Sequence, residues 1–474
     1  MLRSSVAPAM LLTATLLSGG CAGIPPDRGF SAVDSELAAR GLAHAPSVAA
    51  PASVAPPAEW LSTPLTLDMA QRIALSHNPA LLAQFAALGI AQADAFDAAR
   101  LSNPRFSLAW LDGSGGSQIT LGLAQNVAEL LTLSPRKRLA AGEIARVQLE
   151  AGAALVGLAA DTEAAYYRHV AALAGRALKR AIAEAGEVSA DFAAALYAAG
   201  NINQLALDRE RAAAASLGLE AVQADVEVAA TRAALARLMG IGPDLDWQIV
   251  SALPLPASGE DATDELQRVA GAGRLDLLAA QRAVALLEDA LGLTRSVRWL
   301  GDLELGVEHE RDGTRLLGPT LAFQIPLFNQ GQGRVTRAAA RLDAARAAAQ
   351  TSAIDVGHDV AQAQAAVVAA REIVARYRRT LLPLRERIVA GSRQLQNYML
   401  TGQFDVLQDK LALYAAYDAY LRALGDYWVA RANLSRAIGA PLPSAALAGA
   451  GVDPAALLAT PAAPATPTPA HHAH

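Results

Sequence analysis

Hydrophobic and polar residues alternate along four short segments, which form two pairs about 200 residues apart. The first pair covers residues 104–111 and 117–127, and the second pair covers 303–310 and 318–325. A period of two predicts β-strands with one apolar face, and its recurrence predicts an internal duplication. Four such strands cannot close a barrel alone. They can contribute to a shared membrane barrel, in which one face meets lipid and the other lines a lumen.

The large apolar residues of this alternation are the ones that we expect to face lipid. They are Phe106, Leu108, Trp110, Leu121, Leu305 and Phe323. Glu304 falls between them, on the other face, where its carboxylate would line the lumen. Glu308 has the same parity, but it also begins the polar run 308–312. We therefore expect Glu308 to lie in a loop outside the membrane.

Alanine-rich stretches with few glycines follow the first strand pair and predict long helices. Ser134-Pro135 is a helix-start signal, and residues 136–242 contain no proline. A helix over 135–199 would be roughly 95–100 Å long, which is the scale of a rod that spans the periplasm. Gly200 then signals a turn, and a second helix is expected over 204–239.

The second half of the chain repeats this plan. Residues 329–398 are expected to be helical, with a kink or break at Pro383. A turn at 400–403 precedes a closing helix that is expected over 404–438. The motifs around the two turns align residue by residue, which matches Gly200 with Gly402, Asn203 with Asp405, and Leu205 with Leu407.

The N-terminus has the features of an export signal. Arg3 precedes the short apolar run 6–17, and small residues then lead to Cys21, the single cysteine of the chain. This arrangement resembles a bacterial lipoprotein signal, in which cleavage before Cys21 is followed by acylation of its sulfur. An ordinary signal peptide with a chance cysteine is the alternative. One cysteine also excludes a disulfide within the chain.

Composition divides the chain into segments. A lipidated tether rich in Pro, Ala and Ser (21–63) follows the signal peptide (1–20), and the Ala/Pro-rich tail (443–474) is expected to be disordered. Between them lie the two repeats, 64–245 and 263–442, joined by a linker or equatorial segment at 246–262. The tail ends in clustered imidazoles that can bind transition metal ions weakly, namely His471, His472 and His474.

Charge and motifs narrow the class of protein further. The net charge of -5 gives no sign of a nucleic-acid partner. After the leader, no stretch of about 18 residues has the composition of a membrane-spanning helix. The sequence also lacks a nucleophile elbow, a phosphate loop and HExxH or CxxC motifs. We therefore expect neither an enzyme nor a cofactor, apart from the covalent lipid on Cys21.

Several motifs resemble those of the TolC-type outer-membrane efflux proteins, and the lipoprotein signal resembles that of the lipid-anchored branch of this family. The resemblance extends over about residues 63–440, and the motifs fall in order in both halves. They are the segment 65–81, Arg274-Leu275-Asp276-Leu277, the strand-to-helix junction 318–329, Leu382-Pro383, and the turn 402–407. Leu275 departs from the family, which usually has proline at that position.

This resemblance implies a mainly α-helical fold with a contribution to a transmembrane β-barrel. Three subunits with four strands each would form a barrel of twelve strands and a long α-helical tunnel in the periplasm. The protein would be anchored by its lipid in the bacterial outer membrane. It would act as the exit duct of a tripartite efflux system for drugs or heavy metals. Its partners would be a periplasmic adaptor and an inner-membrane pump of the resistance–nodulation–division (RND) type.

In the family, the two turns between long helices close the periplasmic entrance and contact the adaptor. The residues that the resemblance places there are Gly200, Asn203, Gly402, Asp405 and Gln408. Three copies of Asp405 around a narrow entrance would repel one another and attract cations. Asp405 can equally serve as a helix cap after the turn, and Asn203 is expected to act only as a cap.

Two other functions remain open from the sequence. The chain could be the exit duct of a type I protein secretion system. From a different class, it could be a lipidated periplasmic adaptor or a structural helical protein. An adaptor would have one helical hairpin between two lipoyl-like β halves, whereas this chain has two strand pairs and two hairpins.

Overall fold

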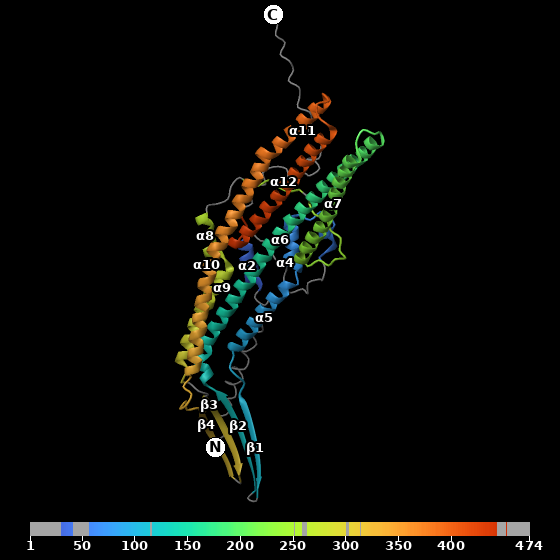
Figure 1. Ribbon diagram of the computed structural model, residues 1–474. Helices are drawn as coiled ribbons and strands as arrows, with labels where there is room; N and C mark the ends of the chain where they lie inside the picture. The colour runs from blue at the N-terminus through green and yellow to red at the C-terminus, as the bar shows by residue number, and fades with distance from the viewer. Residues whose placement is uncertain are drawn as a thin grey trace.

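The computed structural model describes residues 30–40, 56–113, 116–250, 252–257, 263–299, 303–312, 314–442 and 452. The molecule is elongated, with a small β-sheet at one end and two helix–turn–helix tips at the other (Figure 1). This mostly helical architecture with one antiparallel sheet confirms the fold class expected from the sequence.

Both predicted strand pairs are present, and they join into one antiparallel sheet with the order β1-β2-β3-β4. The strands are β1 (Arg105–Gly113), β2 (Gly116–Asn126), β3 (Leu303–Asp312) and β4 (Thr314–Phe323). Each repeat contributes one hairpin, and the pairing of β2 with β3 connects the repeats at the centre of the sheet. Ile325, which continues the apolar alternation in the sequence, lies beyond the end of β4.

The expectation that Glu308 lies in a loop is wrong. Glu308 is inside β3, where it is paired with Gly122 of β2 and Gly318 of β4. The β3–β4 ladder continues to the pair Asp312 and Thr314. Cross-strand pairing therefore extends the strand through a polar run, although the apolar alternation has already ended there.

The helix after β2, α6 (Ala128–Ala198), is 71 residues long and begins before the predicted start at Ser134-Pro135. Its beginning is fixed by the sheet, because the Val127 N–H donates to the Leu303 carbonyl oxygen at 2.8 Å. The Asn126 side chain also accepts a hydrogen bond from the Ala128 N–H at 3.0 Å. α6 continues through Pro135, although proline lacks the N–H that would bond to the Leu131 carbonyl oxygen.

The second long helix is interrupted near Pro383, as the sequence predicts. A five-residue π-helical segment, η1 (Tyr377–Leu381), separates α10 (Gln332–Arg376) from α11 (Leu382–Asn397). Pro383 lies at the start of α11. The missing N–H of proline accounts for a local change of hydrogen-bond register at this point. The closing helix of this half is α12 (Gln403–Ile438).

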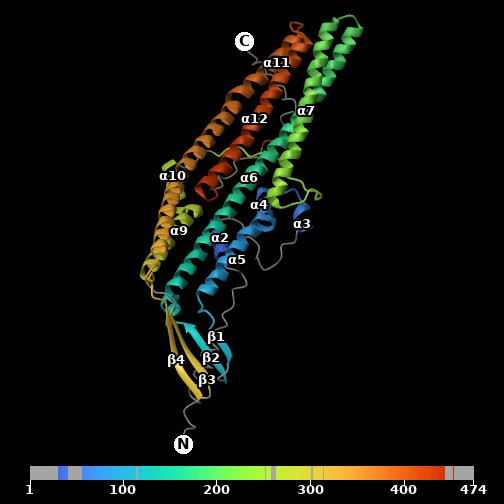
Figure 2. The same ribbon diagram turned by 60° about the horizontal axis from the view of Figure 1, so that its bottom comes forward.

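The remaining helices complete two matching halves. The first half contains α4 (Leu67–His77), α5 (Ala80–Ala98) and α7 (Gln204–Met239), and the second contains α8 (Thr263–Gly273) and α9 (Leu275–Ser296). Near the sheet the helices pack in the order α5-α6-α9-α10, which is the order of the strands that they join. Toward the tips the order becomes α7-α6-α12-α11, with α10 also against α12 (Figure 2).

The main core lies where the linker between the repeats crosses α6 and α12. Tyr167 stacks on Trp428 with ring centroids 4.9 Å apart, and the Trp428 indole N–H donates to the Pro254 carbonyl oxygen at 2.8 Å. The hydroxyl of the fully buried Tyr427 accepts a hydrogen bond from the Ala257 N–H. The tail contributes one described residue, Val452, which forms a β-bridge with Leu253.

Part of the expected tether is folded. Helix α2 (Phe30–Ala39) buries Phe30, Val33 and Leu37 against α5 and α6, and the short helix α3 (Ala58–Leu61) follows later. The spacing of these three residues makes one apolar stripe on the helix, which the high proline and alanine content of the segment conceals. Among the described residues, no single helix has the length and composition to cross a membrane. The bent pair α4 and α5 passes that test jointly, with 49° between the two helices.

Candidate functional site: the sheet faces and the helical tips

The register of the sheet collects the large apolar side chains on one face, which we call the apolar face. Leu108 pairs with Leu121, and Leu305 pairs with Leu321, so all of these side chains leave the same side. All six residues expected to face lipid lie on it. In the single chain, its exposed members are Phe106, Leu108, Trp110, Leu121, Leu123, Leu305, Val307, Leu317, Leu321 and Phe323. An exposed apolar surface of this extent needs a partner or a lipid environment.

The opposite face carries small and polar residues, and we call it the polar face. A side chain at Gly306 would come within 2.8 Å of the Leu123 carbonyl oxygen, so this face is closely packed. Glu304 lies here, as expected, and its Oε1 is 3.1 Å from the Arg105 guanidinium. The structure adds two acids that the sequence reading did not place here, Glu308 and Glu310, and Gln118 donates a hydrogen bond to Glu310. The pairing of β3 with β4 through residue 312 places both acids on this face.

The edges of the sheet are open in the single chain. No strand that the structure describes pairs with the outer side of β1 or β4, and all nine residues of β1 are exposed. Long open edges beside an apolar face favour pairing with another chain. The helices repeat this arrangement, because α5 and α7 form one edge of the helical layer and α10 and α11 form the other.

The first tip joins α6 to α7 through a tight turn. Gly200 adopts φ +77°, a left-handed conformation that glycine tolerates best. The Asn201 N–H donates back to the Leu196 carbonyl oxygen at 2.9 Å. Asn203 is the N-cap of α7, and its side-chain oxygen accepts from the Ala206 N–H at 2.9 Å. Asn203 therefore acts as a helix cap.

The second tip joins α11 to α12 with the same backbone plan and different residues. Met399 has the left-handed conformation, with φ 60°, and the Leu400 N–H donates to the Leu395 carbonyl oxygen at 2.9 Å. Gly402 is the N-cap of α12. Three residues later, Asp405 accepts hydrogen bonds from the Gly402 N–H at 3.0 Å and from the Thr401 hydroxyl at 2.8 Å. Asp405 thus stabilises the helix start from the first turn.

This geometry corrects the residue matching that the motifs suggest. The left-handed positions match Gly200 with Met399, and the N-caps match Asn203 with Gly402. The burial pattern agrees, because the residue four places after each N-cap is buried: Leu207 in the first tip and Val406 in the second. The motif alignment brings the two glycines together, although they occupy different positions of the turn.

Contacts just behind the tips hold each hairpin together. The Ser189 hydroxyl of α6 donates to Glu210 of α7 at 3.0 Å, and the Ser392 hydroxyl of α11 donates to Asp409 of α12. The two hairpins touch through Phe192 and Phe404, whose ring centroids are 6.2 Å apart. All five residues that the sequence assigns to the tips are exposed, namely Gly200, Asn203, Gly402, Asp405 and Gln408.

Comparison with known proteins identifies the architecture. No family model and no curated protein sequence matches the chain. Among solved structures, the outer membrane channel CmeC of Campylobacter jejuni aligns over 83% of this chain and 88% of its own, with 16% identity and a TM-score of 0.66. The outer membrane protein VceC of Vibrio cholerae aligns over 79% of this chain and 96% of its own, with 18% identity and a TM-score of 0.64. The chain has a TolC-like fold.

A third structure with this TolC-like fold is the open state of the outer membrane channel MtrE of Neisseria gonorrhoeae. It aligns over 79% of this chain and 89% of its own, with 19% identity and a TM-score of 0.61. The alignments cover most of each chain. At these identities the comparison concerns the fold, and the roles of individual residues rest on the geometry described above.

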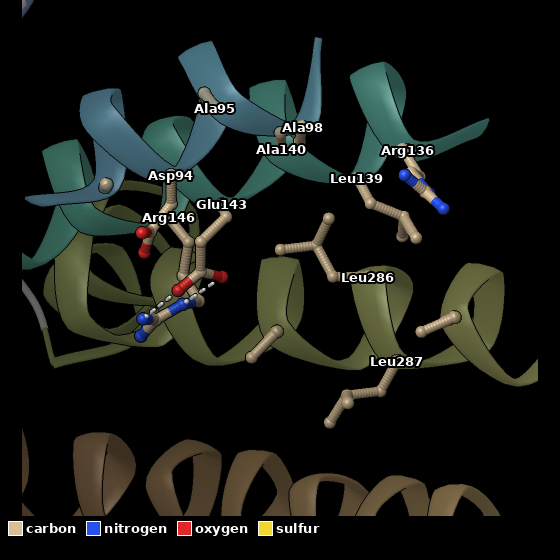
Figure 3. Close-up of a pocket in the computed structure, with 13 residues that line it drawn as sticks. Asp94, Ala95, Ala98, Arg136, Leu139, Ala140, Glu143, Arg146, Leu286 and Leu287 are labelled. Atoms are coloured by element: carbon tan, nitrogen blue, oxygen red, sulfur yellow. Dashed lines mark hydrogen bonds and ion pairs between the residues drawn. The ribbon is translucent and has the colours of Figure 1, made fainter. Parts of the chain in front are cut away.

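Away from the sheet and the tips, one pocket between helices of the TolC-like chain contains charged side chains. The mostly apolar pocket between α5, α6 and α9 has a volume of about 600 Å³ (Figure 3). Leu139 and Leu286 point into it, and at one end Glu143 is paired with Arg146 at 2.6 Å. The Arg146 guanidinium lowers the pKa of Glu143. Asp94 and Arg136 are the other charged residues of the lining, and the rest of it is apolar.

A buried histidine lies between the two helices of the first hairpin. His169 of α6 is hydrogen-bonded through Nδ1 to the Thr231 hydroxyl of α7 at 3.0 Å. Burial, together with the positive charges of Arg232 and Arg176, lowers the pKa of His169 to about 4. His169 is therefore neutral at physiological pH and serves the packing of this hairpin.

Two sets of expected site residues lie outside the described part of the chain. They are Cys21 with its lipid, and the terminal His471, His472 and His474. Within the described ranges, no cluster of three or more His, Cys, Asp or Glu side chains has the arrangement of a metal site.

Proposed function

We propose that three copies of this chain form the exit duct of an efflux system in the bacterial outer membrane. The observation that carries this proposal is the shared order of strands and helices, β1-β2-β3-β4 and α5-α6-α9-α10, with both edges open. One edge of a copy can join the opposite edge of the next copy, and a head-to-tail contact of this kind closes a ring. The sheet would then become a barrel and the helical layer a tunnel.

The edge helices carry apolar stripes suited to such contacts. On α7, Leu219, Val222 and Val226 are 61–65% exposed and follow a spacing of three and four residues. On α11, exposed Leu384, Ile388 and Leu395 have helical spacing as well. Stripes with this spacing bury their side chains when two helices pack side by side. In the proposed ring, α7 of one copy lies beside α11 of the next.

The two faces of the sheet fit a position in a membrane. The apolar face would meet lipid and the polar face, with Glu304 and Glu308, would line the lumen. The helices would extend into the periplasm, because they leave the sheet from the end opposite its hairpin turns (Figure 1). Acylation of Cys21 would add a lipid anchor beside the barrel. The similar solved structures CmeC and MtrE are outer membrane channels, which supports this location.

The tips are the proposed binding sites for other proteins of the system. Both tips are exposed, and the second presents three apolar side chains in a row, Tyr398, Met399 and Leu400. A periplasmic adaptor would dock here and connect the duct to an inner-membrane pump of the RND type. In this arrangement the pump selects the drug or metal ion, since a wide duct makes few contacts with its cargo.

A test of the proposed assembly is the replacement of an edge residue. Val222→Asp places a charge in the apolar stripe of α7, and we expect the purified protein to fall from trimer to monomer in detergent by light scattering. Glu220→Gln is the matched control, because it also changes one charge and Glu220 is exposed on the same helix but points away from the stripe. The parent and the control should also conduct ions in planar bilayers. A monomeric parent, or a trimeric Val222→Asp variant, would contradict the proposed ring.

A further inference from the structure

A pair of arginines ends the apolar face at the hairpin turn of the second repeat. Arg311 of β3 is paired directly with Arg315 of β4, and on its other side with Ile119 of β2. His309 and Leu317 form the next pair inward on the same face. Both arginine side chains are exposed, and neither forms an ion pair with any side chain that the structure describes.

Two like charges directly opposite each other destabilise a β-hairpin. An anion held between them turns this repulsion into attraction. Directly paired residues have Cβ atoms about 4.5–5.5 Å apart, so both guanidinium groups can reach one small anion. The planar fork of arginine matches phosphate oxygens in a bidentate manner. The pair therefore has the spacing and chemistry of a phosphate site.

The position of the pair indicates where that phosphate comes from. Arg311 is eight residues after Leu303, which is about 27 Å along an antiparallel strand. With a strand tilt of about 40°, this becomes roughly 20 Å along the membrane normal, close to the height of a barrel's apolar band. The arginines would thus lie at the lipid headgroups of the leaflet farthest from the helices (Figure 2).

We propose that Arg311 and Arg315 bind the phosphate group of a lipid in the outer leaflet. This inference rests on the proposed membrane barrel. The acid of the neighbouring hairpin on this face is Asp112, which is opposite Ser117 on β1. β1 is two strands from β3, about 10 Å away, so Asp112 leaves the pair accessible to an anionic headgroup. The trimer would carry three such sites around its barrel.

The test uses the full-length protein reconstituted into neutral-lipid vesicles, with flotation as the check of membrane insertion. Vesicles receive increasing amounts of a bis-phosphorylated glucosamine glycolipid, and the readout is the dissociation temperature of the oligomer. For the double variant R311Q/R315Q, we expect the glycolipid concentration at half-maximal stabilisation to rise about tenfold or more. E310Q changes a charge at the same height on the polar face, and R341Q removes an exposed arginine of α10. Both controls should respond like the parent.

The outcomes distinguish failure of the proposed arginine site from failure of the proposed membrane barrel. If the parent floats and the double variant responds to the glycolipid like the parent, the arginine site is wrong and the barrel stands. If the parent fails to float with vesicles, both are wrong. Equal stabilisation by the phosphate-free glycolipid, or by inorganic phosphate alone, would also overturn a lipid phosphate site. Stabilisation that needs the phosphorylated lipid and both arginines supports it.

Discussion

The first helical hairpin, α6 with α7, and the second, α11 with α12, place the same backbone events in the same order. Each has a helix end, a left-handed residue, and an N-cap three residues later. In the first hairpin, Gly200 provides the left-handed residue and Asn203 the cap. In the second, Met399 takes the left-handed conformation, and the N-cap Gly402 has no side chain but donates its own N–H to Asp405. The duplication has kept the backbone geometry, while the residues that support it differ.

This difference gives the two tips different surfaces. The left-handed position is a glycine in the first tip, whereas Tyr398, Met399 and Leu400 of the second are 76%, 93% and 72% exposed. The second hairpin also follows the π-helical interruption of its long helix, whereas α6 is continuous to its tip. The second tip therefore combines apolar groups, an acid and a break in the supporting helix. We expect the proposed docking of a periplasmic adaptor to depend more strongly on this second tip.

The largest expected effect is a dependence of the unfolding free energy on pH in the first hairpin. His169 inside this hairpin is neutral in the folded protein, because its pKa is lowered to about 4 from 6.5. Below pH 6.5 the unfolded chain binds a proton that the folded chain does not, so the unfolding free energy falls as the pH decreases toward 4. The loss approaches about 3 kcal/mol. Hydrogen exchange in α7 should accelerate over this range more than exchange in α11.

His169→Gln is the variant that sharpens this prediction, because glutamine can keep a hydrogen bond to Thr231 and does not titrate in this range. Its exchange in α7 should depend less on pH than that of the parent. His358→Gln is the control, since His358 is exposed on α10 of the second half. Equal acid sensitivity of the two hairpins in the parent would show that burial of His169 does not control the stability of the first.

The next prediction compares substitutions at two equivalent positions, which should change the unfolding free energy in opposite directions. Gly200→Ala places a side chain at φ +77° with nothing within 4 Å, so the cost is backbone strain alone, about 1–2 kcal/mol. Met399→Gly removes the corresponding strain at φ 60°. Its gain is smaller, up to about 1 kcal/mol, because glycine also increases the entropy of the unfolded chain. Denaturant unfolding measures the free energy of each variant relative to the parent. If both variants are less stable than the parent, Gly200 and Met399 are not equivalent positions.

The sequence predicts repeated local patterns better than positions set by contacts between distant segments. The period of two located the four strands, and Gly200 and Pro383 marked real interruptions of helices. Local patterns could not show that β3 continues to Asp312, because its polar end is fixed by pairing with β4. They also could not place the start of α6, which the hydrogen bond from Val127 to Leu303 fixes across the duplication.

The tips show the same limit on a smaller scale. A glycine in a turn motif predicts a turn, but it does not predict which residue of the turn is left-handed. Gly200 takes that position in the first tip, whereas Gly402 is an N-cap in the second. The choice depends on where the preceding helix ends. Aligning the two glycines therefore moved the matching of the tips by three residues.

A smaller effect compares the caps. Asn203→Ala removes the hydrogen bond to the Ala206 N–H and should cost about 1 kcal/mol. The equivalent change in the second tip, Gly402→Ala, removes no side-chain cap and should change the unfolding free energy much less. Thermal unfolding of the two variants provides the comparison. Similar losses of unfolding free energy at both sites would contradict the assignment of a side-chain cap to Asn203 and none to Gly402.

The last prediction concerns Asp405 and separates its structural role at the helix start from a proposed electrostatic role. Its carboxylate accepts from the Gly402 N–H and the Thr401 hydroxyl, and it remains exposed at the tip. If the second tip lines the entrance of a trimer, three carboxylates meet near the axis and attract multivalent cations. Asp405→Asn keeps an oxygen that can accept both hydrogen bonds and removes the charge. Asp405→Ala removes both.

Single-channel recordings in planar bilayers separate the two roles. Both variants should lose block by multivalent cations, whereas only Asp405→Ala should lower stability, by about 0.5 kcal/mol or more. Ala206, the residue at the same position of the first tip, provides the matched test. Ala206→Asp adds a charge to that tip and should increase block only if the first tip also faces the axis. If Asp405→Asn is blocked like the parent, the carboxylate acts as a helix cap alone.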